Sequence, residues 1–167
     1  MTSPSQPSGA LYPRDPVLLV AYDGSPMSEA QLHLACRSAD NIDGVVRVLH
    51  VVELSRHIPL DAPLSQAEQE QIDAVLDRAE RIAARYGVRC QLEVERARSV
   101  GEAIVAHAQE INARTIFIGL RDRNRPGTSL MLSGTLRYVL QRAPCPVQIG
   151  YLPAGLPDEL AREDRTL

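Results

Sequence analysis

Several residue types that common binding functions require are scarce in this chain. Its 167 residues include no Trp, one Phe and five Tyr, so neither a base-stacking surface for single-stranded nucleic acid nor the aromatic walls of a flavin site are expected. No apolar run approaches the roughly 20 residues that span a bilayer, and no apolar leader opens the chain. The net charge of −3 gives no reason to expect a nucleic acid or membrane partner.

Cysteine is also sparse. Cys36, Cys90 and Cys145 are far apart, and no Cys-x-x-Cys or Cys/His cluster accompanies them, which argues against a structural zinc site. Three isolated thiols are typical of a reduced, cytoplasmic protein rather than of a disulfide framework.

No catalytic set is evident either. The Gly-x-x-x-x-Gly-Lys phosphate loop is absent, and Ser25 lacks the Gly-x-Ser-x-Gly surroundings of a hydrolase nucleophile. His107 is expected to be buried on the inner face of its helix, His50 to be structural, and His33 and His57 to lie at the surface. We therefore expect no enzyme, and any nucleotide hydrolysis to be slow and incidental.

The length of the chain predicts one domain. Residues 1–14, which contain prolines and serines, are expected to form a flexible tail. Residues 15–152 are expected to form the domain, and residues 153–167 a second, loosely held tail.

Five strands are predicted within the domain. The apolar runs at 17–21, 45–52 and 115–118 are typical of strands that are covered on both faces. Residues 88–94 and 147–151 alternate between apolar and polar, which indicates one wet face and hence the edges of a sheet.

Four helices are predicted between the strands. Ser25 and Pro26 suit a helix start, while Ser65 with Glu68, and Ser99 with Glu102, form capping boxes. Gly87 is expected to end the second helix. The predicted helices cover residues 26–40, 65–86, 99–111 and 134–143.

This alternation predicts an α/β fold, a three-layer, doubly wound, five-stranded parallel sheet with right-handed crossovers. With strands three and five at the edges, the order is 3-2-1-4-5. A ligand crevice is then expected beyond the carboxyl ends of strands one and four.

Two loops would meet at that crevice, residues 22–26 and 119–135. Asp23 could accept hydrogen bonds from a ribose or an amide, coordinate a metal, or cap its own loop. Gly134 and Thr135 at a helix N-terminus could hold a phosphate through backbone N–H groups, with Gly127 letting the loop fold over it. The alternative is an ordinary loop that uses its glycines for tight turns.

The motifs at these positions resemble those of the universal stress proteins, in the correct order over roughly residues 16–151. The resemblance rests on a strand followed by Asp23-Gly24-Ser25, on Leu49-His50-Val51-Val52, on Ile116-Phe117-Ile118-Gly119 followed by Ser133-Gly134-Thr135, and on the specific run Ala143-Pro144-Cys145-Pro146-Val147.

The resemblance implies an adenine nucleotide alpha hydrolase-like fold and a homodimer that acts in stress response and binds ATP, with or without Mg²⁺. Asp23, with Ala21 beside it, would contact the ribose or the adenine, and the Val51 backbone would meet the adenine edge. The ribose and the triphosphate would be lined by Ile118, Gly119, Gly127, Gly134, Thr135 and the Leu136 amide. We expect the homodimer to form through the edge of the fifth strand, at Val147, Ile149 and Tyr151, where backbone groups are unpaired.

One loop departs from the family pattern. ATP-binding members have a glycine, two residues, a second glycine, nine residues, then glycine with Ser or Thr. Counting back from Gly134 reaches Asn124 and Arg121 instead, so Gly119 stands two residues too far upstream. Asn tolerates positive φ, and Arg123 and Arg125 could contact phosphates, whereas Pro126 removes an N–H donor. A dimeric interaction module without a nucleotide is therefore the alternative function.

Overall fold

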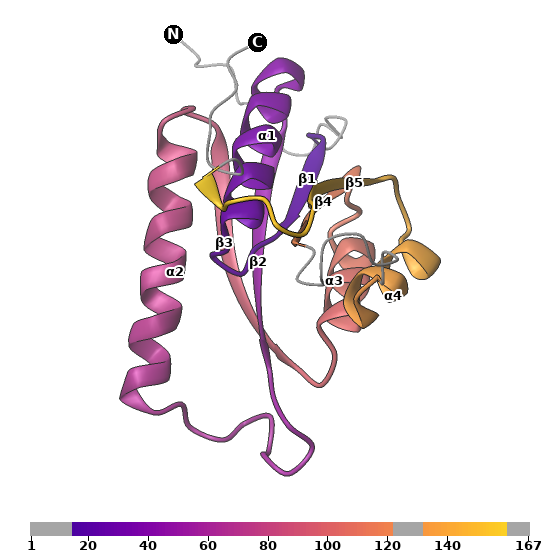
Figure 1. Cartoon of the computed structure of the whole chain (residues 1–167). Coiled ribbons are helices and arrows are strands. Elements are labelled where there is room, and N and C mark those ends of the chain that lie inside the picture. Colours follow the sequence, from indigo (N-terminus) through magenta and orange to yellow (C-terminus); the bar gives the residue numbers. More distant parts are fainter. Residues whose placement is uncertain (1–14, 122–131, 160–167) are drawn as a thin grey trace, which may run out of the picture.

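The structure, a computed structural model, describes residues 15–121 and 132–159. Within those ranges strands and helices alternate along the chain (Figure 1). The elements are β1 (Val17–Ala21), α1 (Pro26–Ile42), β2 (Val45–Glu53), α2 (Gln66–Ala84), β3 (Arg89–Ala97), α3 (Val100–Glu110), β4 (Thr115–Arg121), α4 (Gly134–Arg142) and β5 (Val147–Leu152).

The strands form one parallel sheet in the order β3-β2-β1-β4-β5, which confirms the predicted order. β1 lies at the centre and pairs with β2 on one side and β4 on the other. Its side chains point alternately to two covered faces, so Leu18, Leu19 and Val20 are all buried. This double burial is why β1 reads as an unbroken apolar run.

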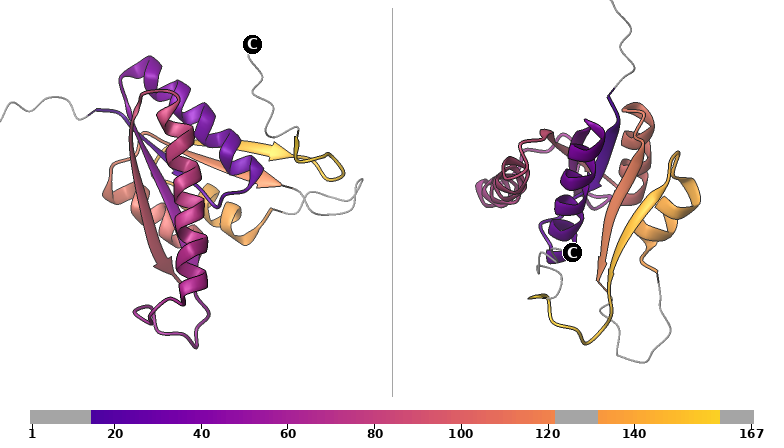
Figure 2. Two further views of the ribbon diagram at one scale, coloured as in Figure 1. Left: turned by 90° about the vertical axis from the view of Figure 1, so that its left-hand side faces the viewer. Right: turned by 90° about the horizontal axis from the view of Figure 1, so that it is seen from above.

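The helices cover both faces of the sheet, as Figure 2 shows. On one face α1 and α2 pack against alternate residues of β1 and β2, with Leu18, Val20 and Val48 in the shared core. On the other face α3 and α4 pack against Leu19 and Ile116. The molecule therefore has the three layers of a doubly wound fold.

Serine caps begin the helices. The hydroxyl oxygens of Ser25, Ser65, Ser99 and Ser133 each accept a hydrogen bond from the backbone N–H three residues ahead. Ser65 and Glu68 form the full reciprocal capping box that the sequence predicts.

Several boundaries differ from the prediction. β4 continues to Arg121, and β2 and β3 remain paired as far as Glu53 and Ala97, because partner strands extend one another beyond their apolar cores. α2 ends at Ala84, and tighter i→i−3 hydrogen bonds carry the chain from there to Gly87, which has φ of 63°.

The expected tail 1–14 and residues 160–167 lie outside the described residues. Residues 153–159 follow β5, and Asp158 reaches the cavity described below. None of the helices in the described ranges has the length and apolar character needed to cross a membrane.

Candidate functional site

A cavity of about 380 Å³ opens at the carboxyl ends of β1 and β4. This is the position that the strand order predicts for a ligand crevice. The loop after β1, the end of β2, the first turns of α1 and α3, and the start of α4 surround it. The side chains and backbone of these elements that line it are Ala21, Tyr22, Asp23, Ser25, Pro26, Met27, Ser28, Leu49, Val51, Val100, Ile104, Ile118, Gly119, Leu120, Ser133, Thr135, Leu136 and Asp158.

Most of the residues predicted for a nucleotide site meet at this cavity. Those that line it are Ala21, Asp23, Val51, Ile118, Gly119, Thr135 and Leu136. Gly134 stands between the lining residues Ser133 and Thr135. Arg123, Arg125 and Gly127 lie outside the described residues, so the effect of the altered loop stays a prediction.

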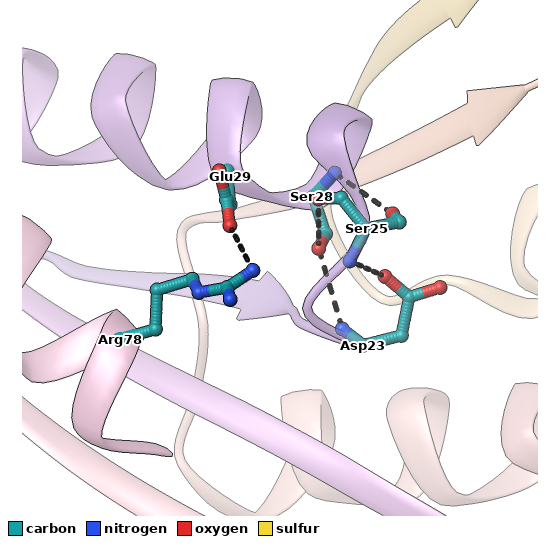
Figure 3. A network of polar contacts seen from close by, with 5 residues as sticks. All are labelled: Asp23, Ser25, Ser28, Glu29 and Arg78. Atoms are coloured by element: carbon teal, nitrogen blue, oxygen red, sulfur yellow. Dashed lines mark hydrogen bonds and ion pairs between the residues drawn. The ribbon is translucent and has the colours of Figure 1, made fainter. Parts of the chain in front are cut away.

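The loop after β1 is fixed by its own hydrogen bonds (Figure 3). The Ser25 N–H donates to Asp23 Oδ1 at 2.9 Å, and the Asp23 N–H points to Ser28 Oγ at 3.4 Å. The Ser28 N–H donates to Ser25 Oγ at 3.2 Å, and the Ser28 hydroxyl returns a bond to the Ser25 carbonyl at 2.9 Å. Asp23 Oδ1 therefore caps its own loop, and the Asp23 side chain also lines the cavity.

These bonds keep Asp23 ionised. Its partial removal from water raises the pKa, but hydrogen bonds from Ser25 and Ser28 outweigh that effect, and the net pKa is lower than usual. The cavity thus has a carboxylate at the end of β1 that remains an acceptor at neutral pH.

The inner wall of the cavity is apolar. Leu49 and Ile104 are 1% exposed and Ile118 is 6% exposed. At the end of β2, His50 Nδ1 donates to the Tyr22 carbonyl at 2.8 Å, which holds the loop after β1 against this wall. His50 therefore has the structural role expected from the sequence.

The opposite rim is the N-terminus of α4. Ser133 accepts a hydrogen bond from the Leu136 N–H at 3.2 Å, so that amide, which the family resemblance assigns to a ligand, is engaged by the cap. The N–H groups of Gly134 and Thr135 have no acceptor within the described residues, as is usual in the first turn of a helix. Apart from its chain neighbours and the backbone of its own helix, no atom of the described residues lies within 4 Å of the place where a Gly134 Cβ would stand. The helix therefore presents two open donors at its positive end.

Gly119 has a different environment. A Cβ built there would lie 2.6 Å from the Met27 carbonyl carbon, because the first turn of α1 rests directly on β4. Gly150, its partner in β5, is covered in the same way by the Gln31 side chain. Because Gly119 has no side chain, α1 can pack directly against β4 at this position. Gly119 also lines the cavity.

Sequence reasoning missed the lining residues on helices. Met27 and Val100 stand in the first turns of α1 and α3. Every helix that follows a parallel strand begins at the carboxyl edge of the sheet, so the topology could have pointed to both. Asp158 gave no such signal, because the strand pattern does not fix the path of the chain after β5.

Two other histidines contact protein side chains. His33, expected at the surface, is half-buried, and its Nδ1 lies 2.7 Å from the Tyr86 hydroxyl. His107 is buried as expected, and its Nε2 lies 3.3 Å from Glu93 Oε2.

The cysteines are unpaired thiols. Burial raises the pKa of Cys36 to about 12 and that of Cys90 to about 11, which leaves both thiols protonated and unreactive at neutral pH. Within the described ranges, no group of three or more His, Cys, Asp or Glu side chains could hold a metal ion.

Comparison with known proteins gives a consistent result. The sequence model of the universal stress protein family matches residues 17–149. A search of curated protein sequences gives no match.

Solved structures with the same fold include universal stress proteins. One from Archaeoglobus fulgidus is 22% identical, covers 81% of this chain and 93% of its own, and has a TM-score of 0.66. Another structure from Archaeoglobus fulgidus, in complex with dAMP, is 20% identical, with coverage of 81% and 96% and a TM-score of 0.62. A universal stress protein family protein from Arabidopsis thaliana with AMP bound is 13% identical, with coverage of 81% and 91% and a TM-score of 0.56.

Proposed function

The chain belongs to the universal stress protein family, and on that premise we propose that it is a regulatory protein that binds ATP in the cavity at the ends of β1 and β4. The observation that carries the proposal is the pairing of an apolar wall with an open helix N-terminus across one cavity. Its volume of about 380 Å³ falls within the range of small-molecule sites.

Each part of the nucleotide has a matching surface. Val51, Leu49 and Ile118 offer an apolar face to the adenine. Asp23 Oδ2 is an ionised acceptor within reach of a ribose hydroxyl. The N–H groups of Gly134 and Thr135, with the Thr135 hydroxyl, suit a phosphate at a helix N-terminus. The relatives solved with dAMP and with AMP support an adenine nucleotide.

Magnesium would enter with the phosphates. Mg²⁺ is often held by one or two carboxylates together with substrate phosphates and waters. Asp23 and Asp158 are the lining carboxylates of the described cavity. Because the described lining holds no His, Lys or Cys that could act as a nucleophile or activate a serine or threonine, we propose a binding protein rather than an enzyme.

Calorimetric titration with AMP and Mg-ATP tests the proposal. We expect submillimolar binding, and a loss of about tenfold or more in affinity for Asp23→Ala, which removes a hydrogen bond to a charged group. Gly134→Val should weaken binding similarly, because the isopropyl group would stand beside the open N–H groups in space that is otherwise empty.

Gly134→Ala is the matched control, since a methyl group leaves those donors accessible. Neither Gly134 variant should unfold at a lower urea concentration than the unmodified protein. The absence of heat with submillimolar ATP and AMP would contradict nucleotide binding and favour the alternative, a dimeric interaction module of the same fold.

The broader role follows the family. We propose that the protein acts in the cytoplasm in stress response, and that it forms a homodimer through the outer edge of β5. That edge is not paired with another strand within the described residues, and parallel-sheet edges readily pair with a second chain.

A further inference from the structure

A second hollow lies between α1 and α2, and it shares no lining residue with the nucleotide cavity. Its volume is about 240 Å³, and both helices contribute to its walls. From α1 come Glu29, Ala30 and His33, while α2 supplies Arg78, Arg81 and Ile82, and Arg85 directly follows the end of α2. We call this hollow the α1–α2 groove.

The groove is positively charged. Three arginines face a single glutamate, so with His33 neutral the lining carries an excess of two positive charges. The whole chain, by contrast, has a net charge of −3. A cationic groove on an acidic protein concentrates small anions locally.

Only one of the three arginines is neutralised. Arg78 Nη1 lies 3.0 Å from Glu29 Oε1 (Figure 3), and the Glu29 side chain is only 13% exposed. Arg81 and Arg85 make no ion pair and no side-chain hydrogen bond within the described residues. Two guanidinium groups at positions i and i+4 of one helix face therefore remain available to an anion.

The helix dipole accounts for only part of this arrangement. Cations are favoured in the last turns of a helix, and that preference would be satisfied on any face of α2. It does not require that all three arginines face α1 across a hollow. The helix dipole therefore does not explain why all three arginines line the groove.

Two tyrosine side chains interact with residues that line the groove. The Tyr86 hydroxyl holds His33 Nδ1 at 2.7 Å, which fixes the imidazole on the α1 wall. Tyr22, which is 3% exposed, has a hydroxyl with no hydrogen-bond partner within the described residues. Glu29, Arg78 and Arg81, which line the groove, are among the charged residues that influence this hydroxyl, although Tyr22 itself lines the nucleotide cavity.

We propose that the α1–α2 groove is a second anion-binding site, which takes a compact phosphate or diphosphate group through Arg81 and Arg85. A guanidinium presents parallel N–H donors that match two oxygens of one phosphoryl group. The two free arginines would each hold one phosphoryl group, and Arg78 would remain with Glu29. The site is separate from the nucleotide cavity and does not depend on it.

Titration with inorganic pyrophosphate at low ionic strength tests this site, with orthophosphate and methyl phosphate as further arms. We expect saturable binding of pyrophosphate at millimolar concentrations or below. The Nε–H resonances of Arg81 and Arg85 should shift in proton–nitrogen spectra, whereas that of Arg114 should not. If methyl phosphate binds as tightly as orthophosphate, the site accepts the phosphate group of an organic molecule. If methyl phosphate binds more weakly than orthophosphate, the ligand is the inorganic ion.

The double variant Arg81→Gln with Arg85→Gln should weaken pyrophosphate binding by about tenfold or more. Arg114→Gln is the matched control, because Arg114 is also exposed but precedes β4 and does not line the α1–α2 groove. Equal loss in the control, unchanged affinity in the double variant, or no saturable binding to the unmodified protein would each overturn the proposal. Adenine nucleotide titration of the double variant should be unchanged, which separates this site from the proposed function.

Discussion

Gly119 and Gly134 both stand at the nucleotide cavity, yet their surroundings are opposite. At Gly119 the α1 backbone occupies the space that a Cβ would need, whereas around Gly134 that space is empty. Neither Gly119 nor Gly134 has a positive φ, unlike Gly24, Gly87 and Gly155. The distinction therefore concerns space and not backbone strain.

A methyl group should separate the two positions. Gly119→Ala forces Met27 away from β4, and overpacking of this kind typically costs about 1–3 kcal/mol. Gly134→Ala replaces a helical glycine with a better helix former in open space, so stability should stay the same or rise by about 0.5–1 kcal/mol. Urea unfolding of the two variants measures both values. Equal stability of the two would contradict the close contact between α1 and β4.

The sequence pattern placed these glycines at a ligand site. In the structure, Gly119 also makes room for α1 to pack against β4. A glycine after an apolar strand is compatible with a ligand, a turn or a closely packed helix, and the three have the same local pattern. Only the position of α1, fixed by contacts distant in the sequence, distinguishes them. The same limit applies to Asp158, whose approach to the cavity depends on the path of the chain beyond the last strand.

At the scale of helices and strands, local signals were the most informative. Serine caps and capping boxes act within four residues, so Ser65 with Glu68 could be read directly. Strand ends were less accurate, because β3 extends to Ala97 through pairing with β2. The alternating pattern also predicted that Val94 faces the core, but its side chain is 42% exposed. Leu92, two residues earlier, still packs against the core.

Two of these caps should have different consequences when removed. Ser65→Ala should cost about 1 kcal/mol, expressed as faster amide exchange in the exposed first turns of α2, with nucleotide titration unchanged. Ser133→Ala should cost a similar amount and also alter nucleotide binding, because Ser133 lines the cavity and begins α4. Hydrogen exchange and calorimetry on both variants check this. Equal effects of the two variants on nucleotide affinity would contradict a role for the α4 N-terminus.

For the whole molecule, the sequence was sufficient to predict the strand order. The two alternating strands, β3 and β5, are the edges, and the continuous apolar runs are the interior. This follows because an interior strand of a parallel sheet is covered on both faces and an edge strand less completely. The cavity position then follows from the reversal of winding, and the helix starts that line it follow from the same topology, whereas the approach of Asp158 does not.

The proposed homodimer can be tested at the two edges. Tyr151 in β5 is 41% exposed and Val94 in β3 is 42% exposed, so they form a matched pair. Tyr151→Arg should shift the mass measured by light scattering from dimer to monomer at micromolar concentration, because a charge on the edge opposes pairing. Val94→Arg should leave the dimer intact. A monomeric unmodified protein, or dissociation by Val94→Arg alone, would contradict an interface at β5.

The central position of β1 also determines the order in which the chain can fold during synthesis. β1 pairs with β2 across the single helix α1, but its other neighbour, β4, begins only at Thr115. The side of β1 that will pair with β4 therefore stays unpaired while α2, β3 and α3 are being synthesised. Long-range pairing of this kind slows folding and exposes apolar strand surface. We therefore expect the nascent N-terminal half, with this edge of β1 unpaired, to aggregate more readily than the complete chain.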